Sequence, residues 1–457
     1  MYNIIIKNVE NKYDFAELIK IFLRPEEFNA YTEAEYAEKE ENCESAELFV
    51  FNEERSDDKN EIKREIYNKL SQLTGEKPAW GILTGVRPVK LTGELFQRLG
   101  TQAAVENELA HTYLLADEKI SLLTDTYNYQ QKTCGNPPNN SVGVYIGIPF
   151  CPTRCLYCSF TSNQVGDAEI TRYLGALKTE IRYVGRRMRE TGLTAESIYI
   201  GGGTPTTLTA EQLDDLLQTV EDNLDLRMLK EFTVEAGRPD TITYEKLEAI
   251  HKHKVERISI NPQSMKERTL ELIGRSHEPS DIVKAFQKAD RVGIPIVNAD
   301  LITGLPEETP EDFARTLDEI LALDPENITV HTLAVKRASR LVDVDKDFHY
   351  KQAQTVAEML KIAKEKLKAA GFRPYYLYRQ KHMAGAFENV GYCKDDTPSI
   401  YNIRIMEEKQ TILRLSDYGR KGTQVWRLFS STSWSKIGAP GKYIIAALTA
   451  GRRKPAD

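Results

Sequence analysis

The chain has 457 residues, of which 41% are hydrophobic and 28% charged, and its formal net charge is −7. This size and apolar content suit a globular protein with one large domain and appendages, or with two or three domains. The negative charge argues against nucleic acid as a general partner. No apolar run is long enough to span a membrane, and no signal peptide is recognisable at the N-terminus, so we expect a cytoplasmic protein.

Residues 1–140 are predicted to form a small α+β domain of unknown role. Short apolar runs predict strands at 2–7 and 47–51, and amphipathic spacing predicts a helix at 60–73. Proline and asparagine residues cluster at 136–141 and mark a linker to the next domain.

From residue 141 to about 345, short apolar strands alternate with amphipathic helices. Right-handed crossovers between such strands give a parallel sheet with helices outside it, here curved into a partial barrel of six units. The predicted strands are 144–148, 197–200, 232–235, 257–260, 294–302 and 328–332, and the predicted helices are 169–189, 210–223, 244–253, 280–292 and 311–323.

The most informative motif follows the first of these strands. Cys151, Cys155 and Cys158 lie within YIGIPFCPTRCLYCSF, residues 145–160. Three thiolates on one loop can bind three irons of a cubane cluster and leave the fourth iron open for chemistry. The alternatives are unrelated buried cysteines or a structural zinc site, but zinc prefers further ligands from a second CxxC or from a His pair at zinc-finger spacing, and the sequence has neither. The other three cysteines are scattered, which fits a reducing compartment.

Further candidates lie where the other strands end, since ligands bind at the carboxyl ends of parallel strands. The second strand ends in GGGTPT, residues 201–206, where glycines let a ligand approach the backbone, although tight turns also need glycine. Glu235 ends the third strand and can pair with an ammonium group or with a neighbouring side chain. Asp300 lies among apolar residues of the fifth strand, so it needs a partner or a ligand.

These sequence motifs resemble those of a known superfamily. CxxxCxxC with the aromatic Tyr157 before the third cysteine is similar to the radical S-adenosylmethionine (SAM) superfamily. YIGIPFC and GGGTPT more narrowly resemble the oxygen-independent coproporphyrinogen III oxidase (coproporphyrinogen dehydrogenase) group, and ENVGY at 388–392 resembles its HemZ-type branch. The resemblance runs from about residue 143 to about residue 412.

The resemblance implies an α/β fold with a partial (β/α)6 barrel and two cofactors. A 4Fe–4S cluster would be bound by the three cysteines, and its open iron would chelate SAM, present as one or two molecules. No side chain is assigned a catalytic role beyond these cofactors. The positions that would contact SAM are Tyr145, Tyr157, Gly202, Gly203, Thr204, Glu235, Gln263, Arg275, Asp300 and Ala334.

The implied activity belongs to haem biosynthesis. One electron, from a reduced donor such as flavodoxin or ferredoxin, would cleave SAM to a radical that takes hydrogen from a propionate of coproporphyrinogen III. Two such rounds, each with loss of carbon dioxide and an electron, would give the two vinyl groups of protoporphyrinogen IX. Four propionates need cations, for which we consider Arg154, Lys336, Arg337, Arg340, Arg379 and Lys381, although each can equally be a solvated charge.

One departure from the group keeps a second function open. Characterised oxidases of this group carry another cysteine two places after the third, whereas Ser159 and Phe160 follow Cys158 here. Related chains without that cysteine include haem chaperones, so the alternative is a haem-binding trafficking protein on the same fold with no dehydrogenase activity. The chaperones carry an HNxxYW motif. The most similar segment here is ENVGYC, residues 388–393, which favours the HemZ-type interpretation.

The C-terminal part divides into two segments. Residues 346–412 continue the family resemblance. Residues 413–457 form an atypical tail: from residue 414 onward it holds nine Lys or Arg against two Asp and two of the three tryptophans, with no clear helical or strand period. Our hypothesis is a frameshifted or otherwise aberrant terminus; a genuine basic tail is the alternative.

Overall fold

The computed structural model describes residues 1–38, 47–160, 162–336, 338–345, 348–381, 383–394 and 396–415, and the backbone of Tyr443–Ala446. The chain divides into two compact units. The first contains Met1–Asn128, Tyr378–Lys381 and Gly385–Phe387; the second contains Tyr129–Leu377, His382–Ala384 and Glu388–Asp457.

The first unit is built on a three-stranded parallel sheet in the order β2-β1-β3. Ile4 and Ile6 of the central strand pack with Phe15 and Ile66 in one apolar core. The strands predicted at 2–7 and 47–51 and the helix predicted at 60–73 are confirmed. The elements are β1 (Tyr2–Ile6), α1 (Tyr13–Phe22), β2 (Phe28–Thr32), α2 (Glu33–Ala37), β3 (Glu47–Phe51), α3 (Lys59–Thr74), α4 (Pro88–Leu99) and α5 (Gln102–His111), followed by α6 (Asp117–Thr133), which begins in this unit.

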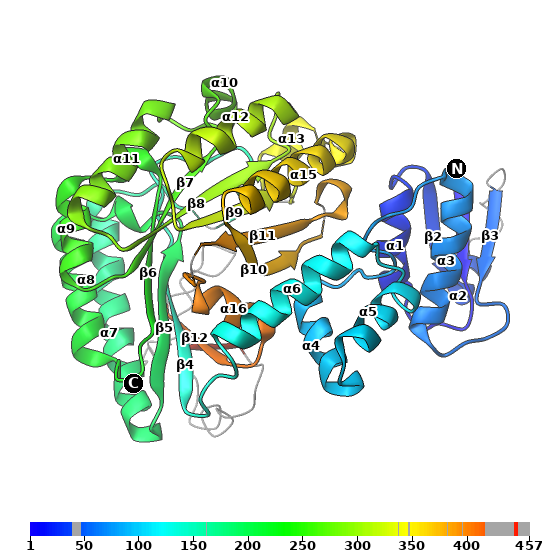
Figure 1. Cartoon of the computed structure of the whole chain (residues 1–457), viewed down its shortest axis with the longest axis horizontal. Helices are drawn as coiled ribbons and strands as arrows, with labels where there is room; N and C mark the ends of the chain where they lie inside the picture. The colour runs from blue at the N-terminus through cyan, green and yellow to red at the C-terminus, as the bar shows by residue number, and fades with distance from the viewer. Residues whose placement is uncertain are drawn as a thin grey trace, which may run out of the picture. The chain divides into compact units, whose positions relative to one another are not determined.

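The second unit contains the predicted alternation of strands and helices (Figure 1). Six neighbouring strands, β4 to β9, pair in parallel in chain order. All six predicted strands and all five predicted helices are confirmed, with small shifts at their ends. The elements are β4 (Ser141–Ile148), α7 (Asp167–Thr191), β5 (Thr194–Gly202), α8 (Ala210–Asn223), β6 (Glu231–Gly237), α9 (Tyr244–Lys252), β7 (Arg257–Gln263), α10 (Glu267–Leu272), α11 (Pro279–Val292), β8 (Ile296–Thr303), α12 (Pro310–Leu321) and β9 (Asn327–Thr332).

Local sequence explains where these helices begin and end. Thr209 and Gln212 form a reciprocal capping box that starts α8, so two N-terminal amides are satisfied at once. Gly192 ends α7 at φ 70°, a left-handed conformation that glycine adopts without strain. Each helix then buries one apolar face, such as Leu213, Leu216 and Leu217 of α8.

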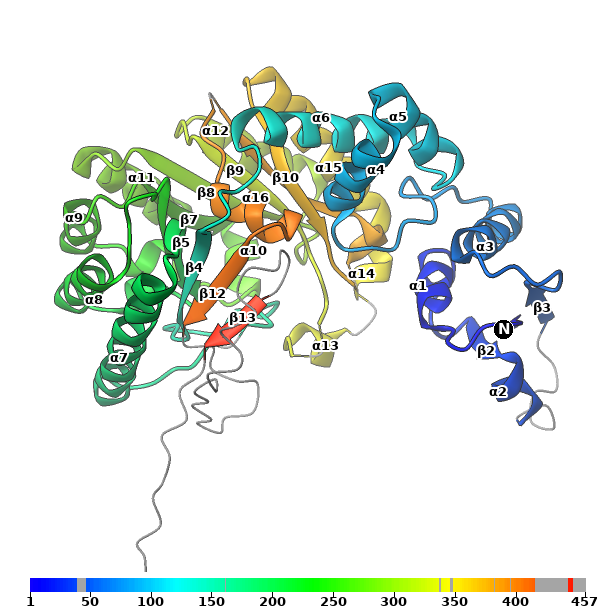
Figure 2. The same ribbon diagram turned by 90° about the horizontal axis from the view of Figure 1, so that it is seen from below.

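Strands from the C-terminal region extend the sheet at both edges. β11 (Glu388–Cys393) pairs antiparallel with β9, and β10 (Arg373–Arg379) lies beyond it. At the other edge β12 (Thr411–Leu415) pairs in parallel with β4, and β13 (Tyr443–Ala446) pairs with β12 (Figure 2). β12 therefore reaches three residues into the tail predicted at 413–457. Apart from β13, the remainder of that tail lies outside the described residues.

The other elements of the second unit are α13 (Leu341–Val344), α14 (Phe348–Lys351), α15 (Ala353–Ala369) and α16 (Ile400–Glu407). Among the helices in the described part of the chain, none combines the length and apolar content that crossing a bilayer requires.

Candidate functional site

The sheet register brings the cysteine loop and the glycine turn together. Ile148, the last residue of β4, lies opposite Gly202 at the end of β5. The amides of Gly203 and Thr204 then donate to the carbonyl oxygens of Ile148 and Phe150, at 2.8 and 2.7 Å. The two predicted motifs therefore leave the sheet side by side.

The cysteine loop is tied to the turn and to the segment after α10. Cys151 Sγ lies 3.3 Å from Thr204 Oγ1, and the Leu156 amide donates to the carbonyl oxygen of Ile273 at 2.9 Å. Leu156 and Tyr157 also pack against an apolar cluster formed by Ile302 of β8 and by residues from the segments that follow β7, β8 and β9. The loop is thus held by both backbone and side-chain contacts.

Glu235, at the carboxyl end of β6, accepts two hydrogen bonds. Tyr199 Oη donates to Oε1 at 2.6 Å, and the Gly202 amide donates to Oε2 at 3.2 Å. Burial, and after it the negative charge of Asp300, raise the pKa of Glu235 to about 7, although both hydrogen bonds oppose the shift. This carboxyl group is therefore poised to gain or lose a proton near neutral pH.

Three tyrosines stack beside Glu235. The ring of Tyr199 lies 4.5 Å from that of Tyr401 of α16, and the ring of Tyr145 lies 6.2 Å from that of Tyr199, with interplanar angles of 21° and 16°. The Arg414 guanidinium lies over Tyr145, with 5.1 Å between its central carbon and the ring centroid. The stack makes an aromatic wall next to the carboxylate.

Alternate positions of β7, β8 and β9 carry polar side chains that form hydrogen bonds with one another, both within β8 and between neighbouring strands. Asn298 donates to Asp300 Oδ1 at 2.7 Å and to Ser259 Oγ at 2.8 Å, and it accepts from Thr329 at 3.0 Å. His331 Nε2 lies 3.7 Å from the same Asp300 oxygen. The expectation that Asp300 needs a partner is met by this network. The intervening residues of these strands, such as Ile258 and Val330, are buried in the apolar core.

Gln263 and Arg275 retain polar atoms without a partner. Gln263, at the end of β7, has the left-handed φ of 69°, and its buried Oε1 accepts no hydrogen bond from the residues that the structure describes. Arg275 donates to the Asn261 carbonyl oxygen at 2.6 Å and to Tyr157 Oη at 3.1 Å, while its buried Nε has no partner within the described part of the chain. A polar ligand can satisfy both groups.

Ala334 and the candidate cations have different surroundings. Ala334 forms an isolated antiparallel bridge with Met383. The guanidinium groups of Arg154 and Arg340 donate to the carbonyl oxygens of Ala338 and Arg154 respectively.

Two of the remaining cations belong to the first unit. Arg379 is buried, and its guanidinium donates to the carbonyl oxygens of Leu83 and Ala386 within the first unit. Because these carbonyl oxygens occupy the guanidinium, the prediction that Arg379 binds a propionate is wrong. Lys381 donates to Tyr13 Oη. Lys336 is in the described part of the chain, whereas Arg337 lies outside it.

The described residues fit a 4Fe–4S cluster and SAM. No three His, Cys, Asp or Glu side chains among them converge on a single metal ion, but in a cubane cluster each thiolate ligates its own iron. Burial raises the pKa of Cys151 to about 11 and also raises that of Cys158, so bound iron would be needed to make them thiolates. An added Cβ at Gly203 would lie 2.5 Å from the Phe150 carbonyl oxygen, so only glycine fits this turn.

Some residues of this site were not predicted from the sequence. The polar alternation in β7 to β9 was a usable signal for Ser259, Asn298 and Thr329, since every second residue of a strand faces the same side. Tyr199 and Tyr401 had no such signal, because their stacking joins two distant elements.

Comparisons with known proteins identify the family. Residues 145–320 match the model of the radical SAM superfamily. The oxygen-independent coproporphyrinogen-III oxidase-like protein HemZ of Bacillus subtilis (strain 168) is 41% identical over 360 residues, covering 78% of this chain and 72% of that protein. The heme chaperone HemW of the same strain is 33% identical over 51% of this chain and 61% of its own length.

A solved structure is also similar. Coproporphyrinogen III oxidase (HemN) from Escherichia coli, a radical SAM enzyme, aligns with a TM-score of 0.48 and 22% identity over 62% of this chain and 61% of that chain. The extent of the match to HemZ is decisive, because it spans more than two thirds of both chains. This chain therefore belongs to the radical SAM superfamily, whose members use a 4Fe–4S cluster and SAM, and within it to the family of oxygen-independent coproporphyrinogen-III oxidase-like proteins that includes HemZ.

Proposed function

We propose that this protein is a radical SAM oxidoreductase that converts coproporphyrinogen III to protoporphyrinogen IX in haem biosynthesis. The observation that carries the proposal is the convergence of the cysteine loop, the glycine turn and Glu235 at the carboxyl ends of β4, β5 and β6. The name of HemZ, the relative with 41% identity, supports a porphyrinogen substrate.

In this proposal Cys151, Cys155 and Cys158 hold the cluster. Glu235 in its carboxylate form would bind the ammonium group of SAM, and Tyr199 would keep that carboxylate oriented through its 2.6 Å hydrogen bond. The unused Nε of Arg275 would donate to an oxygen of SAM, and Gln263 Oε1 would accept from it.

The bound cofactors supply the hydrogen-abstracting radical, and the chain's residues position the reactants and exclude water. Each of the two reacting propionates would lose one hydrogen atom from its β-carbon, one molecule of carbon dioxide and one electron, which passes to a one-electron acceptor. The stacked rings of Tyr145, Tyr199 and Tyr401 would shield the reacting carbon from water. We further propose that a reduced flavodoxin or ferredoxin supplies the electron that starts each round.

A haem chaperone is the second candidate, favoured by the 33% identity to HemW. One feature of the chain argues against it. The segment ENVGYC contains no histidine. It forms the buried strand β11, in which Asn389 Oδ1 accepts a hydrogen bond from the Thr332 amide at 2.8 Å. These side chains serve the sheet and offer no imidazole to haem iron.

The two functions are separated by one anaerobic experiment. The reconstituted chain is supplied with dithionite, SAM and coproporphyrinogen III, and vinyl products are measured by mass spectrometry, with Cys155→Ala as the control. The proposal predicts vinyl product from the wild-type chain and none from the variant. Stable haem binding without vinyl product would support the chaperone instead.

A further inference from the structure

A buried arginine that the proposed function does not use lies next to the cysteine loop. Arg238 follows β6 and is 3% exposed. Its Nε and Nη2 donate to the two carboxylate oxygens of Asp240, each at 2.9 Å. Such a bidentate pair fixes the plane and the direction of the guanidinium.

The third guanidinium nitrogen reaches the loop itself. Arg238 Nη1 donates to Thr153 Oγ1, and Thr153 lies midway between Cys151 and Cys155. Thr153 Oγ1 in turn donates to the Gly274 carbonyl oxygen at 3.4 Å, and Arg238 Nη2 also donates to Ser276 Oγ at 3.1 Å. One side chain therefore ties the middle of the loop to the end of β6 and to the segment after α10.

The charge of Arg238 also acts on the loop. Through its contact with Thr153, the Arg238 guanidinium places a positive charge next to the residue that lies two positions from both Cys151 and Cys155. His277 lies 3.8 Å from Asp240, and burial, followed by the charge of Arg275, lowers its pKa to about 4, so this imidazole is neutral at pH 7. The charges next to Thr153 come from the Arg238–Asp240 pair and from the adjacent Arg154, whose guanidinium donates to the Ala338 carbonyl oxygen.

We propose that Arg238 is a positioning residue for the cluster. Anchored by Asp240, it fixes the loop between Cys151 and Cys155 through Thr153, and its charge raises the reduction potential of the cluster. This inference rests on the proposed assignment of the three cysteines to the cluster and is independent of the substrate.

The first test measures how fast the reconstituted full-length chain loses iron to a chelator under anaerobic conditions. Arg238→Met and Thr153→Val should each release iron about 10- to 100-fold faster than the wild-type chain, the range typical for outer-shell partners of a metal site. The double variant should be no faster than the faster single variant, because both changes break one link. Wild-type rates in both single variants, or multiplied effects in the double, would overturn the proposal.

The chain offers a matched control. Arg227 forms the same kind of pair with Asp225, at 2.9 and 2.6 Å, but its side chain is 79% exposed and it precedes β6, at the strand's opposite end. Arg227→Met should therefore release iron at the wild-type rate. Thr153→Val decides the question if Arg238→Met fails to fold, because it removes the same contact with a residue of similar size.

The second test separates electrostatics from a merely structural role. Arg238→Met leaves the negative charge of Asp240 alone, so the cluster should become harder to reduce, whereas Asp240→Asn leaves the positive charge and should make reduction easier. Redox titration followed by electron paramagnetic resonance measures both midpoints. Shifts in one direction, or none, would refute the electrostatic role. A wild-type chain that binds no cluster would refute the proposed function, not this inference alone.

Discussion

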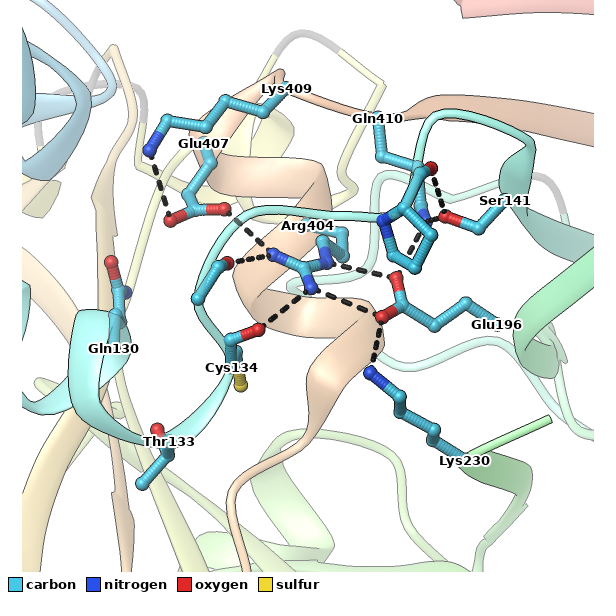
Figure 3. A network of polar contacts seen from close by, with 12 residues as sticks. Gln130, Thr133, Cys134, Ser141, Glu196, Lys230, Arg404, Glu407, Lys409 and Gln410 are labelled. Atoms are coloured by element: carbon cyan, nitrogen blue, oxygen red, sulfur yellow. Dashed lines mark hydrogen bonds and ion pairs between the residues drawn. The ribbon is translucent and has the colours of Figure 1, made fainter. Parts of the chain in front are cut away.

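Replacement of Arg404 tests a fully buried ion pair of the second unit. Arg404 of α16 and Glu196 of β5 are both fully buried, and two guanidinium nitrogens donate to the carboxylate at 3.0 and 3.1 Å. The guanidinium also donates to the carbonyl oxygens of Cys134 and Gly135, at 3.2 and 2.7 Å (Figure 3). The network thus joins α16, β5 and the segment after α6.

Arg404→Met leaves a buried carboxylate without its main partner, which costs about 3–5 kcal/mol of the free energy of unfolding. We expect the lower end of this range, because Lys230 Nζ remains 3.0 Å from Glu196 Oε1. The double variant Arg404→Met/Glu196→Gln removes both charges and should recover part of the loss, since the buried Glu196 charge is gone and Glu407, the other carboxylate paired with Arg404, keeps Lys409 Nζ at 3.7 Å.

Urea unfolding of the full-length chain, followed by far-UV circular dichroism, measures these changes. A loss below about 1 kcal/mol in Arg404→Met, the scale of an exposed pair, would refute the reasoning. So would a double variant that is less stable than Arg404→Met alone.

The pH dependence of the same variant has a definite sign. Burial raises the pKa of Glu196, but the hydrogen bonds and charges of Arg404 and Lys230 outweigh it, and the folded-state pKa lies below the ordinary value. The stability that this carboxylate contributes is therefore present above its unfolded pKa and is lost as pH falls through the folded one. In Arg404→Met the unpaired carboxyl can take up a proton, so the difference from wild type should shrink at acid pH.

Three further predictions concern the candidate site. Because the pKa of Glu235 is about 7, its binding-competent carboxylate is lost as the pH falls below 7. SAM affinity, measured by equilibrium dialysis, should therefore fall by up to about tenfold for each unit that the pH drops below 7, and Glu235→Gln should abolish this dependence. Tyr199→Phe removes a hydrogen bond that lowers this pKa, so the midpoint of the affinity curve should move to higher pH, and an unchanged midpoint would contradict the assignment. Gly203→Ala should reduce bound iron, because its Cβ would lie 2.5 Å from a backbone oxygen, whereas Gly175→Ala, with no atom within 4 Å, should retain full iron content.

Local sequence patterns were sufficient to predict the six core strands, the helices between them and their parallel arrangement. Apolar runs such as that of β4 mark strands buried on one or both faces, and alternation in chain order then implies a parallel sheet. The cysteine motif and GGGTPT are each one short, uninterrupted segment, so their positions at the ends of β4 and β5 followed directly from the strand assignments.

The contacts that shape the site could not be predicted because they join distant residues. Arg238 and Thr153 are 85 positions apart, and the strand β12 that pairs with β4 comes more than 260 residues later in the chain. The left-handed backbone of Gln263 leaves no mark in composition, because glutamine has no preference for it. Arg379 was predicted to be exposed because it is charged. It is buried instead, because backbone carbonyl oxygens accept the hydrogen bonds of its guanidinium within the protein.

The most direct test of the proposed function is deuterium transfer from the substrate. Coproporphyrinogen III labelled with deuterium at the propionate β-carbons is incubated anaerobically with the reconstituted chain, SAM and dithionite, and 5′-deoxyadenosine is analysed by mass spectrometry. The proposal predicts deuterium in 5′-deoxyadenosine in proportion to the vinyl groups formed. Formation of 5′-deoxyadenosine without deuterium and without vinyl product would contradict it.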